Sequence, residues 1–560
     1  MSWPASFIQA LSAPVLTPYY RLEFLPMTTS VNASGVVFSN REGEGRAVIA
    51  GTTTWSGTLT PSPCEITLGG FDVTLAGSLL GVLDDLPAGA IAVLYCHPTG
   101  DEGAAEPWAV GPLEGITRTG LQEVFTLRFG DLIAALSTRQ TLDTSATKAE
   151  ESEAALFWRL SRAAVVFSSG SSVDMTSSGT LTAASGAGNF DYFEQENGQR
   201  GLLKVVNSNG DETLLEWDSK ASSTELTMSG TGPQRGSSTI TWSNLLGSNR
   251  GKVFPMARLT DHPGVIFLKI VASTGTAGST GIYDTLPASW GVDPGGQLFA
   301  FVDVNNVSAW IQEVMVPTTG NYLDGEWDLV SDSRQDSALR WLVTLLLEAG
   351  IFPAMRHGML TLRALQDLNP ATTRQPHGLK TTGLTITDDD IIEVVQLQVP
   401  ASEQQSVART SQVITAEVYD SSTPTREGDP KTYEDTYSGW RAGRLPAMVL
   451  RDHDLSKVLF GRTGASSEQA VAEGDAARML CWDALPWEKL SLKVHSRFAQ
   501  LCKGDIIYLT TNLIYGGLLE TRYGYDAQPM MVTSVRVSLD APDGPTAWVD
   551  LVTVTVPSES

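Results

Sequence analysis

The side chains that most often perform chemistry in proteins are sparse and scattered in this sequence. Only six histidines occur in 560 residues. The chain has neither a GxSxG nucleophile elbow nor an HExxH zinc motif. Gly247 and Gly251-Lys252 lie at the wrong spacing for a phosphate-binding loop, and Val253 stands where that loop needs serine or threonine. The sequence therefore predicts no catalytic residue and no cofactor site.

Two clusters carry residue types that bind metals. Asp452-His453-Asp454 contains ligands that zinc uses, but three consecutive side chains rarely point toward one ion. Asp388-Asp389-Asp390 offers oxygen donors for calcium, yet it lacks the spaced ligands and the glycine of a calcium loop. A solvated turn explains this triplet better. We therefore predict no metal site.

Carboxylates and aromatic residues leave two further functions open. The chain has 63 aspartates and glutamates, so a glycoside-hydrolysing pair can exist without a sequence signature. A stretch rich in Ser, Thr and Gly contains five aromatic residues that could form a platform for sugar: Phe190, Tyr192, Phe193, Trp217 and Trp242. The favoured interpretation is that these rings form the core of a small β-sandwich.

Strands predominate among the elements that would position these residues. Alternating apolar residues over 20–24 predict an early strand, and the continuous apolar run over 90–96 predicts a strand buried on both faces. Residues 108–116 and 124–129 predict a hairpin. Short strands separated by glycine and proline favour a small barrel or sandwich in this part of the chain. A helix is expected over 149–164, where acidic residues come first.

The middle of the chain predicts a mixture of strands and helices. Residues 165–250 resemble an inserted all-β module. Asp261 can cap a helix that carries Pro263 in its first turn. Residues 338–349 place apolar side chains at helical spacing, and a hairpin with its turn at 356–358 follows.

The C-terminal part returns to strands. A capping box at Ser466 and Gln469 predicts a helix that ends near Trp482. Alternating apolar residues then predict strands over 490–494 and 552–556, with others between them. Both ends of the chain are thus strand-rich, which fits two related barrels.

The overall charge and the cysteines limit the classes of function. A net charge of −25 repels phosphate and opposes non-specific nucleic-acid binding, although it also serves solubility, the more economical explanation. The four cysteines, Cys64, Cys96, Cys481 and Cys502, are too few for a disulfide framework. No stretch approaches the ~18 apolar residues of a membrane span. The first charged residue is Arg21, so no secretion signal is expected.

Several blocks, taken in order, resemble baseplate hub (tail tip) proteins of long-tailed bacteriophages. The blocks are Pro112-Leu113-Glu114-Gly115 leading to 125–132; Asp261-His262-Pro263, Ser273-Thr274-Gly275, Tyr283-Asp284, Leu286-Pro287 and Trp290-Gly291; and 487–490 with 503–509. No block is diagnostic alone, and their order carries the resemblance. The stretch 165–250 is not part of the common pattern.

The resemblance implies a mechanical role. Hub proteins of this kind form homotrimers in which each subunit supplies two β-barrels. The resulting ring of six barrels joins the six-fold tail tube protein or distal tail protein to a central fibre or spike protein, and the tape measure protein ends inside it. The channel opens for DNA ejection. No catalytic residue, cofactor or metal is carried over, and the protein would be made in the host cytoplasm and reside in the virion, at the tail tip.

We therefore expect a mainly β protein with α+β parts: two small β-barrel hub domains, a mixed α/β middle and an inserted all-β module. The expected divisions are 1–164, the N-terminal barrel domain with a trailing helix; 165–250, the inserted module; 251–384, a mixed α/β domain; 385–485, a strand-plus-helix region with polar loops; and 486–560, the C-terminal part of the second barrel.

Three functional hypotheses follow from the sequence. The first is a structural, non-enzymatic hub with a wide, acidic channel, no membrane span and no sequence-specific nucleic-acid binding. The alternative is a receptor- or carbohydrate-binding tail protein that acts through 165–250. The third is a tail hydrolase that depends on an unmarked carboxylate pair.

Overall fold

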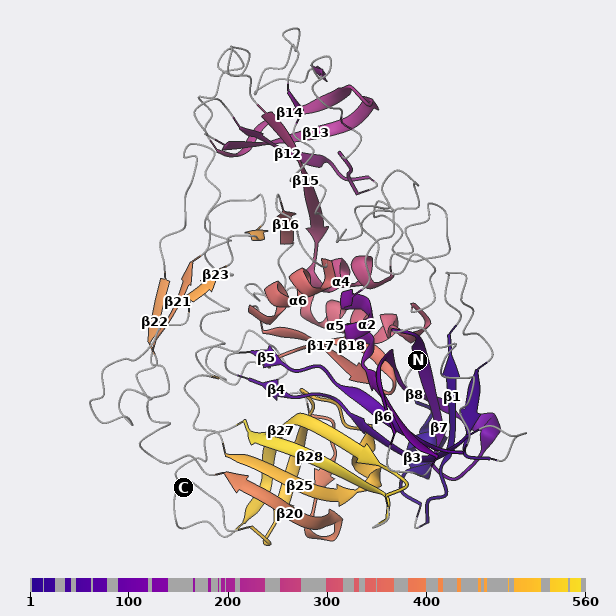
Figure 1. Cartoon of the computed structure of the whole chain (residues 1–560). Coiled ribbons are helices and arrows are strands. Elements are labelled where there is room, and N and C mark those ends of the chain that lie inside the picture. Colours follow the sequence, from indigo (N-terminus) through magenta and orange to yellow (C-terminus); the bar gives the residue numbers. More distant parts are fainter. Residues whose placement is uncertain are drawn as a thin grey trace.

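The protein is mainly β, as expected (Figure 1). The computed structural model describes residues 3–13, 15–25, 36–41, 47–61, 64–77, 89–118, 123–138, 165–166, 180–182, 190, 193–196, 198–206, 212–236, 252–272, 299–315, 327–331, 338–348, 350–366, 381–398, 411–415, 431–434, 452–454, 458–460, 482, 488–514, 524–541 and 544–554. The helices expected over 149–164 and 466–482 lie outside these residues, apart from Trp482. No helix in the described part of the chain is long and apolar enough to cross a membrane.

An N-terminal β unit holds seven strands in the order β2-β1-β7-β8-β9-β6-β3. Their bounds are β1 (Tyr19–Phe24), β2 (Val37–Ser39), β3 (Val48–Trp55), β6 (Gly70–Ala76), β7 (Ile91–His97), β8 (Glu106–Arg118) and β9 (Val124–Gly130). The expected hairpin is β8–β9, and the apolar run forms β7, which is buried along nearly its whole length. A short helix, α1 (Ala5–Ala10), precedes the unit, α2 (Leu132–Thr138) follows it, and β4 (Leu59–Thr60) and β5 (Glu65–Ile66) form a small hairpin within it.

A C-terminal β unit holds strands in the order β20-β25-β28-β27-β26-β19. The bounds are β19 (Thr385–Ile386), β20 (Ile391–Gln398), β25 (Lys489–His495), β26 (Ile506–Thr511), β27 (Tyr525–Ser538) and β28 (Thr546–Thr553). The 3-10 helix η5 (Asp388–Asp390) leads from β19 directly to β20, and η6 (Ser496–Gln500) follows β25. The strand predicted from alternation over 490–494 is therefore present as β25. Of the strand predicted over 552–556, residues 552 and 553 end β28, Val554 follows the strand, and the remaining residues lie outside the described part of the chain.

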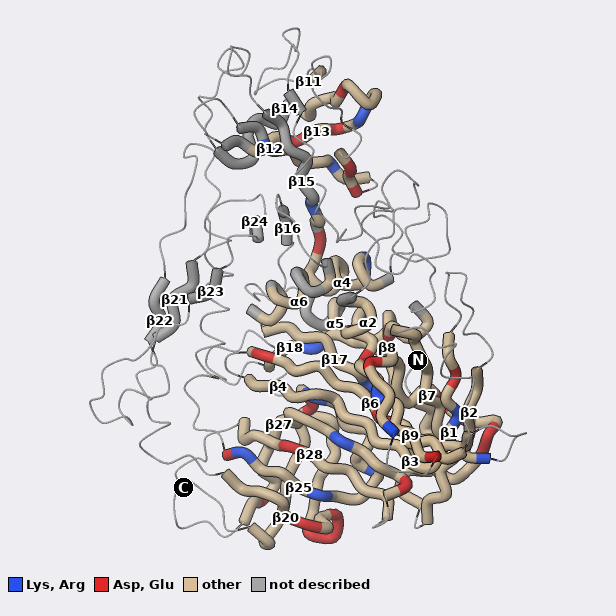
Figure 2. The backbone as a smooth tube through the Cα atoms, viewed as in Figure 1, with Lys and Arg blue, Asp and Glu red and all other residues tan. Residues whose placement is uncertain are grey.

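The two units share one sheet and one core. Strand β3 pairs antiparallel with β27, which makes a single 13-stranded sheet whose edges, among the described strands, are β2, β19 and β20. Side chains from both units form one hydrophobic cluster, with Phe71 and Phe129 on one side and Val532 and Val549 on the other. Basic and acidic residues are interspersed over this sheet rather than gathered in one patch (Figure 2).

A helical layer covers one side of the N-terminal unit (Figure 1). It consists of α4 (Pro263–Ala272), α5 (Val304–Met315) and α6 (Ala338–Glu348), together with α2 and the hairpin β17 (Ile351–Arg356) and β18 (Met359–Ala364). The helix expected over 338–349 and the hairpin turn expected at 356–358 are confirmed. Gly350 follows α6 with φ 70°, the left-handed conformation that favours glycine at the end of a helix.

The start of α4 differs from the predicted cap. The Asp261 carboxylate accepts a hydrogen bond from the neighbouring His262 N–H at 2.8 Å, and it also contacts Lys269 at 3.1 Å. The ring of His262 accepts from Gly264 N–H at 3.1 Å and so caps the helix instead. The helix was predicted correctly, but a nearby cation engages the carboxylate that was expected to cap it.

A peripheral sheet lies beyond the helical layer, at the top of Figure 1. Its order is β11-β14-β13-β12-β15-β16-β24, and β10 also pairs with β15. The bounds are β10 (Val165–Val166), β11 (Thr180–Thr182), β12 (Gly201–Val206), β13 (Glu212–Ser222), β14 (Glu225–Gly236), β15 (Lys252–Asp261), β16 (Trp327–Ser331) and β24 (Val458–Phe460). The sheet therefore continues past residue 250. A separate small sheet joins β21 (Ser411–Thr415), β22 (Lys431–Glu434) and β23 (Asp452–Asp454).

Candidate functional site: the joint between the two β units

The joint is built around the contact between β3 and β27. Beyond the strand pairing, Ser56 N–H donates to the Val535 carbonyl at 2.8 Å, and Val535 N–H donates to Ser56 Oγ at 2.9 Å. The Asp540 carboxylate accepts from Thr52 N–H at 3.1 Å, and Ser538 Oγ donates to the Thr52 carbonyl at 3.2 Å. These bonds connect residues almost 500 positions apart, so the two ends of the chain fold against each other.

A row of cations and indole rings crosses the joint along the sheet. Lys493, Trp548, Arg536 and Trp55 are register partners on four successive strands, β25, β28, β27 and β3. Lys493 and Arg536 lie 5.5 and 5.3 Å from the Trp548 ring centroid, within cation–π range. The row places residues of both units in one cross-strand ladder.

An acidic residue of the N-terminal unit faces this ladder. Burial raises the pKa of Asp72, while the charges of Arg128 and Arg536 act in the opposite direction. Arg536 belongs to β27 of the C-terminal unit, so its charge acts on the pKa of a carboxyl group in the N-terminal unit.

Residues 502–505 form a buried turn of the C-terminal unit that contacts the N-terminal unit in the protein interior. Lys503 is fully buried, and its Nζ donates to the Thr67 carbonyl at 3.3 Å. Burial lowers the pKa of Lys503 and raises that of Asp131, and the two charges attract each other against this effect. The Asp131 carboxylate also accepts from Gly69 N–H at 2.8 Å and from Ala134 N–H at 2.9 Å, the latter in the first turn of α2.

The same turn holds the hairpin β17–β18. The Asp505 carboxylate accepts from Arg363 Nη2 and from Cys502 N–H, both at 2.8 Å. Gly504 has φ 88°, and a Cβ there would lie 2.6 Å from the Phe352 ring. The turn 502–505 therefore connects the N-terminal unit, the C-terminal unit and the middle hairpin.

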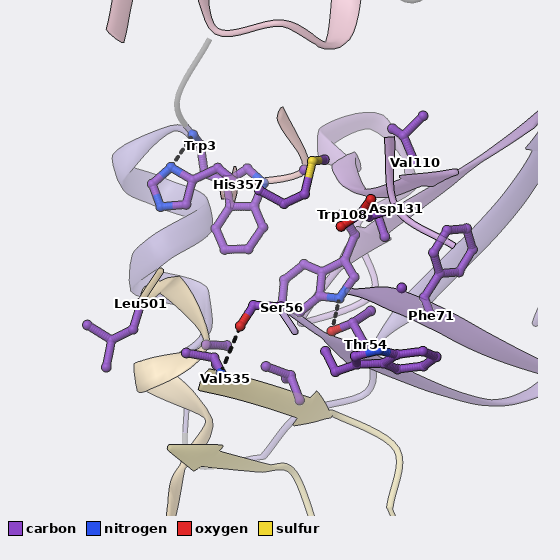
Figure 3. A pocket seen from close by; sticks show the side chains of 17 residues that line it. Trp3, Thr54, Ser56, Phe71, Trp108, Val110, Asp131, His357, Leu501 and Val535 are labelled. Carbon is purple, nitrogen blue, oxygen red and sulfur yellow. Dashed lines mark hydrogen bonds between the residues drawn. The ribbon is translucent and has the colours of Figure 1, made fainter. Parts of the chain in front are cut away.

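Three stacked rings occupy the side of the joint where the hairpin turn lies (Figure 3). Trp3 lies between His357 and Trp108, with ring centroids 4.6 and 4.7 Å away. Trp3 N–H donates to His357 Nδ1 at 3.4 Å, and its indole N–H donates to the Pro107 carbonyl at 3.0 Å. The neighbouring Gly358 has φ 70°, and a Cβ there would lie 2.3 Å from the Pro107 oxygen. The turn thus fits closely against the N-terminal unit.

His357 is held as a neutral ring. Burial lowers its pKa to about 4, and the charge of Arg356 adds to this effect. Nδ1 accepts the hydrogen bond from Trp3, which requires an unprotonated nitrogen. His357 also makes a backbone hydrogen bond with Gln500 of η6. The His357 imidazole, on the turn of hairpin β17–β18, therefore connects that hairpin with Trp3 near the N-terminus and with the C-terminal unit.

A small cavity remains inside the joint. Its volume is about 80 Å³, and Trp3, Trp55, Trp108, Asp131 and His357 are among the residues that line it (Figure 3). This volume has room for several water molecules.

The Asp388-Asp389-Asp390 triplet forms the corner between β19 and β20. Asp390 is buried, accepts from Thr387 N–H at 2.9 Å and pairs with Arg497 at 2.5 Å. Asp388 accepts from Asn512 N–H at 3.1 Å. The turn was predicted correctly, but its third aspartate is not solvated: it is paired inside the unit.

The other predicted clusters do not form a site among the described residues. Asp452-His453-Asp454 is strand β23, which pairs parallel with β21. No group of three or more His, Cys, Asp or Glu in the described ranges could hold a metal ion. Cys64, Cys96 and Cys502 are buried and unbridged, as expected, whereas Cys481 lies outside the described residues.

Three aromatic residues of the peripheral sheet whose side chains are described lie in its core. Phe190 and Phe193 meet edge to face at 4.9 Å, and both are buried, as is Trp217. Tyr192 and Trp242 lie outside the described residues. An accessible sugar platform made of the three described rings is therefore wrong, and the core interpretation applies to them.

Sequence reasoning missed most of the joint. Neither Trp3 nor Asp540 carries a local signal, because each acquires its role from partners far away in the chain. Lys503 and Asp505 lie in a block of the resemblance, but nothing in the sequence assigned them a partner. His357 was placed in the right turn, but its stacking partner was not identified.

Comparison with known proteins gives a distant likeness. No family model and no curated protein sequence matches the chain. Solved structures do match. Structurally, the chain is similar to tail proteins. The 43 kDa tail protein of prophage MuSo2 from Shewanella oneidensis is 8% identical, with a TM-score of 0.35, and the alignment covers 96% of this chain and 99% of that one.

Two further structures show a similar degree of likeness. The tail protein from Neisseria meningitidis MC58 is 9% identical, covers 96% of each chain and has a TM-score of 0.35. The E. coli c3393 protein, a type VI secretion component described as structurally similar to T4 tail proteins gp27 and gp5, is 7% identical over 93% of this chain and 76% of that one, with a TM-score of 0.28.

Proposed function

We propose that the chain is a structural hub of a phage tail tip rather than an enzyme. The observation that supports this proposal best is the joint: two β units that are far apart in sequence share one sheet, one core and a set of buried polar contacts. Such a joint resists relative movement of the units. This property suits a protein that transmits force.

Each unit is proposed to be barrel-like. In the C-terminal unit, η5 leads from β19 at one end of the strand order directly to β20 at the other, and this requires the sheet to curl. In the N-terminal unit, the outermost strands β2 and β3 contact each other. Curling of both sheets is what two small barrels require.

Three copies would then present six barrel-like units, which matches a six-fold ring. We propose a homotrimer that docks on the distal tail protein or tail tube protein, carries a central fibre or spike protein, and contains the end of the tape measure protein. Such a ring would gate DNA ejection. With a net charge of −25, its channel is proposed to be wide and acidic, which would let DNA pass without binding.

The proposed location can be tested on virions. Antibodies against the purified protein, coupled to gold, should label the tail tip of intact particles in electron micrographs. A particle lacking the protein should carry tails without a complete tip. Label on the capsid or along the tail shaft would contradict the proposal.

A second candidate function belongs to the peripheral sheet. The β13–β14 hairpin is exposed over 218–224, in a part of the chain that lies far from the joint (Figure 1). A receptor or a surface glycan of the host is the partner proposed for it. Full-length protein should then bind host cells, and binding that survives removal of the hairpin tip would reject this role.

A further inference from the structure

One strand connects the peripheral sheet with the helical layer. The first half of β15 pairs with β12, with Leu202 and Met256 as register partners. Its second half pairs with β16 and ends at Asp261, directly before α4. Both halves of β15 are paired with neighbouring strands. The strand is therefore a continuous, rigid connection, here called the spine, and not a flexible linker.

A buried ion cluster fixes the end of this spine. Lys269 Nζ on α4 contacts Glu196, in the segment before β12 of the peripheral sheet, at 2.5 Å and Asp261 of β15 at 3.1 Å. The Lys269 and Glu196 side chains are only 6% and 2% exposed. At this depth, removing one partner leaves the other charge buried, which is costly. The cluster therefore connects the peripheral sheet to helix α4 of the helical layer.

The corner between β15 and α4 presses against α5. His262 is fully buried and its ring meets Trp310 edge to face at 5.6 Å. A Cβ on Gly264 would lie 2.6 Å from Ile311 Cγ1. Movement of this corner consequently requires α5 to move.

The two residues directly before α5 lead on to the joint. Asp303 N–H donates to the Leu360 carbonyl at 2.8 Å, and Val302 forms a parallel bridge with Leu360. Leu360 belongs to β18, three residues after His357, whose ring stacks on Trp3. A contiguous series of packed elements thus extends from the peripheral sheet to the joint between the β units.

We infer that the peripheral sheet and the joint are mechanically coupled through β15, the Lys269–Glu196–Asp261 cluster, the His262–Gly264 corner and α5. The inference rests on the proposed function, because it gives an event at the tail surface a route to the body of the hub. Displacement of the peripheral sheet would loosen the seat of the His357–Gly358 turn against Trp3 and Pro107.

The coupling can be measured by amide hydrogen exchange on the full-length protein. In Lys269→Met, exchange should become several-fold faster in 351–366 and 3–11, as well as in α4 and α5. Lys220→Met is the matched control, because Lys220 lies in the exposed tip of the β13–β14 hairpin, where its Nζ donates to the Phe190 carbonyl at 3.4 Å. This control should leave exchange in 351–366 and 3–11 unchanged.

The outcomes separate the inference from its alternatives. Faster exchange confined to the peripheral sheet and α4 would overturn the coupling, as would an equal effect from Lys220→Met. If Lys269→Met fails to fold, Glu196→Gln decides, because it removes the charge and keeps the shape. Exchange is measured on purified protein, so its result does not depend on where the protein lies in the virion. Absence of gold label at the tail tip would contradict the proposed function without contradicting the coupling.

Discussion

The Asp540 carboxylate accepts a hydrogen bond from the backbone N–H of Thr52 at 3.1 Å, although 488 residues separate them in sequence. The bond lies at the end of the β3–β27 contact and holds the last strands of the chain against the first ones. A chain closed in this way should unfold its two β units together, because neither unit retains a complete edge or core without the other.

This bond gives the first prediction. Asp540→Ala should lower the free energy of unfolding by about 1–3 kcal/mol, because it leaves the Thr52 N–H without its carboxylate acceptor. Urea titration at neutral pH measures the change. The control is Asp526→Ala, an exposed aspartate on the same β27 strand. Equal effects of the two substitutions would mean that the Thr52 bond adds nothing to the joint.

The second prediction concerns the buried pair Lys503 and Asp131. Lys503→Met should destabilise the protein by about 3 kcal/mol, because Asp131 loses its buried counter-charge and Thr67 loses a donor. Adding Asp131→Asn should restore part of that loss. The coupling energy comes from a double-mutant cycle in urea, and strictly additive effects would contradict the attraction between the two groups.

The third prediction is a dependence of stability on pH. The pKa of His357 is about 4 in the folded protein and 6.5 ordinarily, so between these values the unfolded chain binds more protons. Stability should therefore fall as pH decreases from about 6.5 to about 4, by up to about 3 kcal/mol from this residue.

The contribution of His357 can be isolated by substitution. His357→Phe keeps an aromatic ring beside Trp3 and removes the titration, so its stability should change less over the same pH range. His495→Gln, on the exposed end of β25, controls for the loss of a histidine as such. A pH slope in His357→Phe equal to that of the unaltered protein would contradict the assignment.

The fourth prediction tests the fit of the hairpin turn. Gly358 and Gly383 have nearly the same positive φ, 70° and 75°. A Cβ added to Gly358 would lie 2.3 Å from the Pro107 carbonyl oxygen, whereas a Cβ added to Gly383 would meet no atom within 4 Å. Both Gly→Ala variants carry the strain of the left-handed conformation, about 1–3 kcal/mol. Gly358→Ala should show a clearly lower Tm than Gly383→Ala, and similar values for the two would mean that the turn is loosely seated.

Local patterns predicted the parts of the fold that local energetics determine. The helix at 338–348, the hairpin at 351–364 and the 124–130 strand each carry their own periodicity or turn residues, and each is present. The start of α4 was also correct, but its cap was not, because Lys269 engages Asp261 through tertiary structure. The division expected at 250 stays a prediction, and β15, which begins directly after it, pairs with β12 before that position and with β16 after it.

The candidate site was beyond sequence reasoning for a physical reason. The β3–β27 contact, the Trp3 stack and the Lys503 turn depend on pairs of residues several hundred positions apart, and one sequence contains no information about which distant residues meet. The prediction that no catalytic cluster exists rested on motifs alone. The joint between the two β units is visible only in the structure.

The account depends most on the proposed ring of three copies. The measurement that tests it most directly is the mass of the full-length protein in solution by light scattering, alone and with a purified distal tail protein. A particle with three copies of the 60.0 kDa chain, in either condition, is the predicted result. A single 60.0 kDa species in both conditions, across the accessible concentration range, would contradict it.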